Sequence, residues 1–207
     1  MKILTLAICL SLGTAAGMAH AQSAPSRLTE TRPSSATEAT DSNPEMRAIF
    51  AADQADRKPG GSMNWPEVSA RDRARKARVR ELLDQGQLKT GDDFYSAAFV
   101  LQHGDASNDF LLAHALAMAA QAKGRSDAAW IAAATLDRFL QKLDRPQIFG
   151  TQFVRAPGEP IGQGAYDREL ISDSLREVLR VPVLEKQAEQ VTRMEASRSA
   201  RDRDGSK

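Results

Sequence analysis

Residues 110–122 read FLLAHALAMAAQA, and this stretch decides the fold. It predicts a helix that is apolar nearly all round, in which His114 and Gln121 are the only strongly polar residues. With about 100° of rotation per residue, these two side chains fall on one stripe. A helix that is apolar on every side is typical of the buried centre of a protein. We therefore expect a mainly α fold built around this helix, whose alanines allow neighbouring helices to approach closely.

Helix start and stop signals divide the flanking sequence into further helices. Asn43 followed by Pro44 is a typical helix start. The same kind of signal predicts helices over residues 43–57, 66–86, 90–104, 107–124, 126–145 and 168–179, and a helical stretch after residue 182. Residues 147–154 and 161–166 are short, punctuated by glycine and partly β-branched or aromatic, which indicates a hairpin or an extended loop. The expected fold class is mainly α: an antiparallel helical bundle or an array of helical hairpins, with a small late β-hairpin.

The N-terminus has the order of a cleavable secretory signal. Lys2 provides the positive start, residues 3–12 are an apolar run, and Ala19-His20-Ala21 has the small residues of a cleavage site. An uncleaved membrane anchor, which is the alternative, needs about 18–20 apolar residues, and this run is shorter. We expect residues 1–21 to be removed as a signal peptide, which leaves a periplasmic or secreted protein without a membrane span. Cleavage also removes Cys9, the one cysteine, and with it disulfides and thiolate chemistry.

Composition marks the ends of the folded region. Residues 22–42 are rich in Ser, Thr, Ala and Glu and almost lack large apolar residues, which predicts a disordered linker. Residues 192–207 predict a charged flexible tail. The interval 43–191 is therefore expected to form a single helical domain.

The overall charge excludes two classes of partner. The chain has 28 Lys and Arg against 27 Asp and Glu, and loss of Lys2 with the signal leaves the two signs equal. A neutral chain argues against a general nucleic-acid binder and against electrostatic binding to membranes. The mean hydropathy of −0.43 excludes a polytopic membrane protein.

Three of the predicted helices place a carboxylate on an apolar face. By the helical repeat, Asp53, Asp72 and Asp137 each lie on the apolar stripe of their own helix. For the helix with Asp72, burial of the opposite face, which carries three alanines, stays open. A buried carboxylate is costly unless it is paired. These residues and their polar neighbours form a predicted inward polar cluster. The candidate ligand-binding residues are Asp53, Asp72, Gln102, His103, His114, Asp137, Arg138, Gln147, Thr151 and Gln152.

Two interpretations of this cluster are open. One is a convergent pocket, in which a histidine acts as an acid or base or joins an aspartate as a metal ligand. The other is a set of satisfied pairs that hold the helices together. The segment 147–153 also has two interpretations. It is either a binding loop that presents its amides to a ligand or a turn whose amides cap helix ends. No metal-ligand spacing, nucleophile motif or phosphate loop is present, so the sequence assigns no catalytic residue, no metal site and no cofactor.

Several of these motifs occur in one order along the chain, namely Asp53-Gln54, Asp72, Gln102-His103-Gly104, Ala113-His114, Asp137-Arg138 and the run from Gln147 to Gln152. In this order they resemble a bacterial family of uncharacterised exported proteins that is marked by Q-H-G, D-R and G-T-Q motifs. The resemblance covers about residues 43–184. It implies a grouping and draws attention to the same polar residues, but it implies no activity.

Three functions agree with these observations. We favour a non-catalytic exported domain that uses the inward polar cluster to bind a protein, a peptide or a small ligand. The first alternative is a hydrolase-like enzyme with a His base and an Asp partner or metal, which requires a carboxylate within hydrogen-bond reach of a histidine in a cleft. The second alternative is a structural envelope component, in which every inward polar group is paired and no cleft is present.

Overall fold

The computed structural model describes residues 41–57, 64–155 and 159–204, with side chains described as far as residue 199. The predicted signal peptide, residues 1–21, and nearly all of the predicted linker, residues 22–42, lie outside the described residues.

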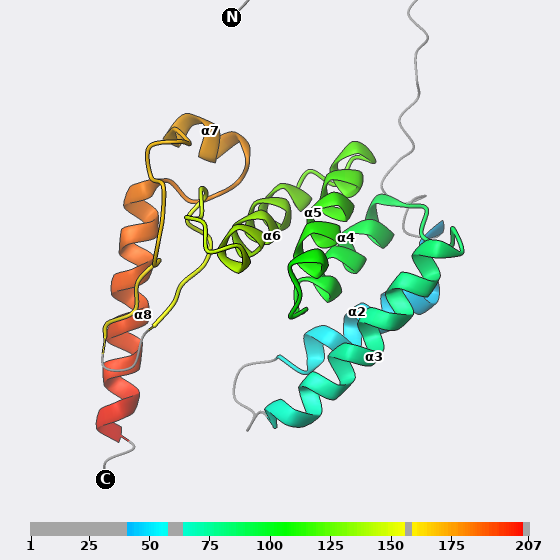
Figure 1. The fold of residues 1–207 in the computed structure, drawn as a ribbon, viewed down its shortest axis with the longest axis horizontal. Helices are drawn as coiled ribbons and strands as arrows, with labels where there is room; N and C mark the ends of the chain where they lie inside the picture. The colour runs from blue at the N-terminus through cyan, green and yellow to red at the C-terminus, as the bar shows by residue number, and fades with distance from the viewer. Residues whose placement is uncertain (1–40, 58–63, 156–158, 205–207) are drawn as a thin grey trace, which may run out of the picture. The chain divides into compact units, whose positions relative to one another are not determined.

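The described residues form seven helices and no sheet, which confirms a mainly α fold (Figure 1). None of these helices is both long enough and apolar enough to cross a membrane. Their bounds are α2 (Pro44–Ala55), α3 (Trp65–Asp84), α4 (Gly91–Leu101), α5 (Ser107–Ala122), α6 (Ala128–Lys142), α7 (Asp173–Val178) and α8 (Leu184–Asp204).

Local capping explains why α2 and α4 begin where they do. The Asn43 side chain accepts hydrogen bonds from the backbone N–H of Glu45 and Met46, and Thr90 forms a capping box with Asp93. The Asp93 carboxylate also accepts the Asn43 N–H at 2.8 Å. One buried carboxylate therefore ties the start of α2 to the start of α4.

The main core lies around α5, which packs against both α4 and α6. Its alanines Ala113, Ala117 and Ala120 are fully buried, as expected for close approach of neighbouring helices. The prediction that this helix is buried on every side is wrong, because Leu111 and Met118 are 44% and 55% exposed. The small alanine side chains bury one stripe of α5, and the opposite face has no described element packed over it.

Between α6 and α7 the described residues, 143–155 and 159–172, form no strands. The predicted β-hairpin is reduced to two isolated bridges, a parallel one between Gln147 and Tyr166 and an antiparallel one between Val154 and Gly162. Buried glutamine side chains donate hydrogen bonds to backbone carbonyls that would otherwise accept hydrogen bonds from a neighbouring strand. The Gln147 amide donates to the carbonyls of Gln152 and Gln163, and a later glutamine, Gln187, donates to the Phe149 carbonyl at 2.9 Å.

The C-terminal helix is longer than the sequence indicates. The segment 192–204, for which the sequence favours a charged flexible tail, continues α8 as far as Asp204. The Glu195 carboxylate on this extension accepts a hydrogen bond from the Ile161 N–H at 3.1 Å. This bond fastens the connecting loop to α8.

Candidate functional site

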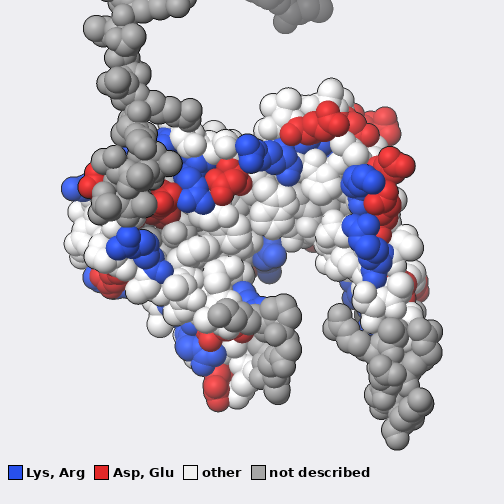
Figure 2. Space-filling view, turned by 180° about the vertical axis from the view of Figure 1, so that it is seen from behind, with Lys and Arg blue, Asp and Glu red and all other residues white. Residues whose placement is uncertain are grey.

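The predicted polar residues do not converge on one pocket. One group lies where α2, α3 and the end of α4 meet, and is called here the ion-pair cluster. On the face that Figure 2 shows, lysine and arginine side chains lie next to acidic side chains. The ion-pair cluster likewise consists of neighbouring positive and negative side chains. The ion-pair cluster consists of Asp53, Asp56, Arg57, Arg71, Asp72, Arg75 and His103.

Each inward carboxylate of the ion-pair cluster has its charge balanced by arginine. Asp53 is fully buried and lies 3.0 Å from Arg57 and 3.0 Å from Nδ1 of His103. Asp72 lies 2.6 Å from Arg57 and 2.9 Å from Arg75. The cluster holds three carboxylates and three guanidinium groups, so it joins the helices without leaving an excess charge.

The third carboxylate of the cluster shows the electrostatic effect of this pairing. Hydrogen bonds from Arg71 and Arg75 lower the pKa of Asp56 from its ordinary value of 3.8 to about 2. The two arginines stabilise the ionised carboxylate more than the neutral acid. Asp56 is therefore a permanent negative partner at neutral pH.

A second group surrounds Asp137, which is completely buried on α6. Its Oδ1 accepts the N–H groups of Ile148 and Phe149 at 2.8 and 3.0 Å. Its Oδ2 accepts both the N–H and the hydroxyl of Thr151, at 2.9 and 2.7 Å. This carboxylate is fully occupied by the loop that follows its own helix, so Asp137 and Thr151 hold the loop in place.

Gln147 and Gln152 belong to the same loop. The Gln147 side chain bonds the Gln152 backbone in both directions, accepting from its N–H and donating to its carbonyl, each at 3.0 Å. The Gln152 side chain donates to Thr151 and to the Ala134 carbonyl of α6, and stays half-buried. Of the two predicted amides, that of Gln152 lines a cavity that is described below.

His114 stands apart from both groups. Its Nδ1 donates to the Ala132 carbonyl at 2.8 Å, which links α5 to α6. No described candidate residue shares a hydrogen bond with it. Its helix turns His114 toward the backbone of α6, so the structure does not bring it together with the other candidate residues.

A cleft beside α6 brings two predicted residues together with three that the sequence analysis missed. Its volume is about 430 Å³. Arg138 and Gln152 were candidates, whereas Gln141 and Lys142 follow Arg138 at the spacing that keeps side chains on one helix face. That spacing is the signal that could have found them. The residues that line this cleft, called here the Arg138 cleft, are Phe110, Arg138, Gln141, Lys142 and Gln152.

Arg138 carries an unbalanced positive charge. Its Nη1 donates to the Gln102 carbonyl at 3.0 Å, and its buried Nε has no hydrogen-bond partner among the described residues. No described carboxylate pairs with it. Burial, and to a smaller extent repulsion from Arg57, lower the pKa of Arg138. An arginine stays charged at neutral pH even when its pKa is lowered. The Arg138 guanidinium is therefore a positive charge without a counterion among the described residues.

The described residues contain no group of three or more His, Cys, Asp and Glu side chains placed to hold a metal ion. Comparison of the chain with models of protein families, with curated proteins and with solved structures gives no match. The resemblance based on the Q-H-G, D-R and G-T-Q motifs stays a prediction. Glycine is nevertheless required at positions 104 and 150 of these motifs on steric grounds. A Cβ added at Gly104 would lie 2.2 Å from Asp109 Oδ2, and one added at Gly150 would lie 2.2 Å from Gln187 Oε1.

Proposed function

We propose that this protein is an exported binding module, periplasmic or secreted, that holds a small anionic ligand in the Arg138 cleft. The ligand bears a carboxylate or phosphate group that the Arg138 guanidinium binds. The observation that carries the proposal is the buried Nε of Arg138, which has no hydrogen-bond partner among the described residues, at a cleft whose described lining contains no acidic residue. Export rests on the order of residues 1–21, which is that of a secretory signal.

The chemistry of the lining supports an anion over a cation or a neutral ligand. Arg138 and Lys142 bring two positive charges, and Gln141 and Gln152 bring amide groups that can donate hydrogen bonds. Phe110 supplies an apolar wall. A few polar groups on one apolar wall are typical of sites for small molecules. Binding of an anion would also remove part of the cost of the desolvated guanidinium.

The test is calorimetric titration of the purified protein with inorganic phosphate, acetate and succinate. We expect saturable binding of at least one of these anions with a Kd of about 1 mM or tighter, which corresponds to roughly −4 kcal/mol. Arg138→Gln removes the charge and should weaken that binding at least about tenfold. Arg138→Lys keeps the charge but lacks the planar guanidinium, so its affinity for the anion should lie between those of the wild type and Arg138→Gln.

Arg145→Gln is the matched control. Arg145 follows α6 closely, is exposed, makes no ion pair with a described residue and is not among the residues that line the cleft, so its loss removes one positive charge outside the lining. If Arg145→Gln weakens the binding as much as Arg138→Gln, the effect is one of net charge and the proposed site is wrong. Absence of saturable binding for all three anions would also contradict the proposal.

A second candidate function rests on the contact between Asp53 and His103. A carboxylate that orients an imidazole through Nδ1 is the arrangement of a general base, which favours a hydrolase-like enzyme. The described cavities are not lined by either residue. The test is hydrolysis of p-nitrophenyl acetate, for which this candidate requires a rate above that of the His103→Gln variant.

A further inference from the structure

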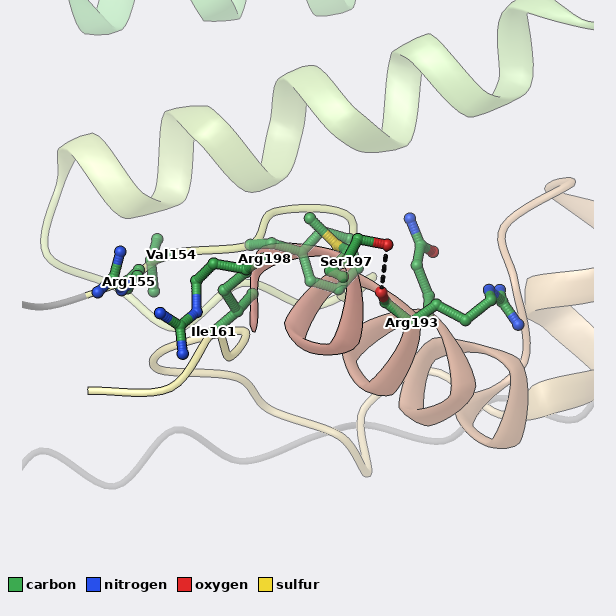
Figure 3. Close-up of a pocket in the computed structure, with 9 residues that line it drawn as sticks. Val154, Arg155, Ile161, Arg193, Ser197 and Arg198 are labelled. Atoms are coloured by element: carbon green, nitrogen blue, oxygen red, sulfur yellow. Dashed lines mark hydrogen bonds between the residues drawn. The ribbon is translucent and has the colours of Figure 1, made fainter. Parts of the chain in front are cut away.

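A second cavity lies between the connecting loop and α8, shares no lining residue with the Arg138 cleft, and is called here the α8 groove. Its volume is about 600 Å³, within the range of small-molecule sites. Figure 3 shows Val154 and Ile161 coming from the loop, and Ser197 and Arg198 coming from α8. Its apolar lining consists of Phe153, Val154, Ile161 and Met194.

The loop side of the α8 groove has few free backbone groups to offer a peptide. Val154 and Gly162 exchange both of their backbone hydrogen bonds, at 2.7 and 3.0 Å. The Ile161 N–H is taken by Glu195. On α8, the Ser197 hydroxyl donates to the Arg193 carbonyl at 2.8 Å, the bond drawn as a dashed line in Figure 3. These backbone groups are already hydrogen-bonded within the protein, so the amides of an extended peptide would find few partners in the groove. An aliphatic chain needs no hydrogen-bond partner.

Charge at the rim of the α8 groove selects a negative head group. Among the described residues, three arginines and no acidic residue line the groove. Arg193 pairs with Glu189 at 3.3 Å, and Arg198 pairs with Glu195 at 2.5 Å. Arg155 donates to the Glu159 carbonyl at 3.2 Å, and its charge also interacts with the Glu195 carboxylate. The three arginines therefore have two carboxylates beside them, Glu189 and Glu195, which leaves one positive charge to bind an anion beside the apolar lining.

We propose that the α8 groove binds a free single-chain carboxylate amphiphile of the fatty-acid class. The alkyl chain lies on Val154, Ile161 and Met194, and the carboxylate pairs with Arg155. This site is separate from the Arg138 cleft and does not depend on the function proposed for that cleft. It differs in ligand as well, because the Arg138 cleft has one apolar wall whereas the α8 groove has an apolar lining on both sides.

The test is calorimetric titration of the purified protein with laurate below its micelle concentration. We expect saturable binding of laurate and none of dodecyltrimethylammonium, which has the same chain length and the opposite charge. Arg155→Gln should weaken laurate binding at least about tenfold, and Val154→Asn about fivefold. Both side chains are exposed, Val154 by 46%, so the variants should fold, and circular dichroism checks this.

Three variants outside the groove serve as controls. Val178→Asn changes an equally apolar and more exposed valine, 75% exposed on α7, and Arg145→Gln removes a charge elsewhere. The laurate titrations are repeated in the Arg138→Gln background, because the Arg138 cleft is proposed to bind carboxylates as well, and laurate binding that persists there belongs to the α8 groove. Equal binding of the cationic amphiphile would overturn the proposal, as would equal losses in the controls.

Two other classes of ligand are outcomes of the same experiment. Binding to phosphatidylglycerol vesicles without binding of monomeric laurate would place the ligand in a membrane surface and overturn the proposal. Tighter binding of an acidic Leu/Glu peptide than of laurate would make the groove a peptide site and would overturn it as well.

Discussion

Asp137 and Thr151 are joined twice, because Oδ2 of the buried carboxylate accepts both the backbone N–H of Thr151, at 2.9 Å, and its hydroxyl, at 2.7 Å. The other oxygen accepts two further N–H groups, from Ile148 and Phe149. A single side chain of α6 thus fixes residues 148–151 of the loop that follows the helix. This loop in turn supplies Gln152 to the Arg138 cleft and Val154 to the α8 groove. Both proposed sites therefore depend on Asp137, although it lines neither.

Asp137→Asn should destabilise the protein by roughly 3 kcal/mol, because an amide has one acceptor oxygen and its NH₂ group would face N–H donors. The free energy of unfolding from urea titration measures this. Asp144→Asn is the control, since Asp144 is exposed and has a φ of 53°, a backbone conformation that asparagine adopts readily. A loss of less than about 1 kcal/mol for Asp137→Asn would contradict the anchoring role.

Gly150→Ala should destabilise the protein more than Gly86→Ala does. Both glycines have a positive φ, 75° and 65°, so alanine costs each about 1 kcal/mol of backbone strain. At Gly150 the new Cβ would also lie 2.2 Å from Gln187 Oε1, whereas nothing lies within 4 Å of it at Gly86. We expect an additional loss of about 2 kcal/mol at Gly150, measured by urea unfolding. Equal losses for the two variants would show that Gln187 moves away at no cost.

The positions of the helices could be predicted because their signals are local. Asn43 and Thr90 cap helices in the structure as their sequence neighbours indicate, and α5 lies where its apolar run lies. The burial of Asp53 and Asp137 could also be predicted, because each position follows from the helical repeat alone. For Asp72 the repeat left open which face of its helix is buried, and the structure buries the face with Asp72.

The partners of these residues could not be predicted in the same way. The groups that satisfy Asp137 come from residues 148–151, in a loop without any periodic pattern. The sequence therefore left open whether the segment was a binding loop or a set of caps. The Arg138 cleft has the same origin, since Phe110 comes from α5 and Gln152 from the loop. Its shape depends on how distant elements pack, which no local signal encodes.

Stability should fall in acid partly because of Asp56. Its pKa is lowered to about 2 in the folded protein by Arg71 and Arg75. A carboxyl whose pKa is depressed by folding stabilises the protein above its unfolded pKa and loses this contribution as the pH falls. The unfolding free energy should therefore drop between about pH 4 and pH 2, and Asp56→Asn should show a shallower drop. Urea unfolding at several pH values measures both slopes.

The matched control for this acid effect is Asp84→Asn. Asp84 is exposed at the end of α3 and makes no ion pair with a described residue. Its slope should equal that of the wild type. If Asp56→Asn has the wild-type slope as well, the pairs with Arg71 and Arg75 add nothing in solution, as is common for exposed ion pairs.

Asp53 and His103 should show energetic coupling in a double-mutant cycle. Their contact of 3.0 Å joins α2 to the end of α4, and Asp53 is fully buried. A hydrogen bond of this kind predicts a coupling of about 1 kcal/mol between Asp53→Asn and His103→Ala. The same cycle with His114→Ala in place of His103→Ala should give no coupling, because His114 bonds the Ala132 carbonyl instead. Equal coupling for both histidines would mean that Asp53 acts through the fold as a whole.

Arg138→Met should separate a binding role of Arg138 from a structural one. Methionine keeps most of the length and apolar volume of the side chain but removes a desolvated charge that has no described counterion. It leaves the Gln102 carbonyl without its donor, which costs about 1 kcal/mol, and removal of the unpaired charge offsets this. We therefore expect the unfolding free energy to stay within about 1 kcal/mol of the wild-type value, while binding of the anions is lost. A residue that serves only the fold would behave in the opposite way: its replacement would lower the unfolding free energy by several kcal/mol and leave no binding to lose. Urea unfolding and calorimetry on the same preparation distinguish these outcomes, since the first reports what Arg138 contributes to the fold and the second what it contributes to a ligand.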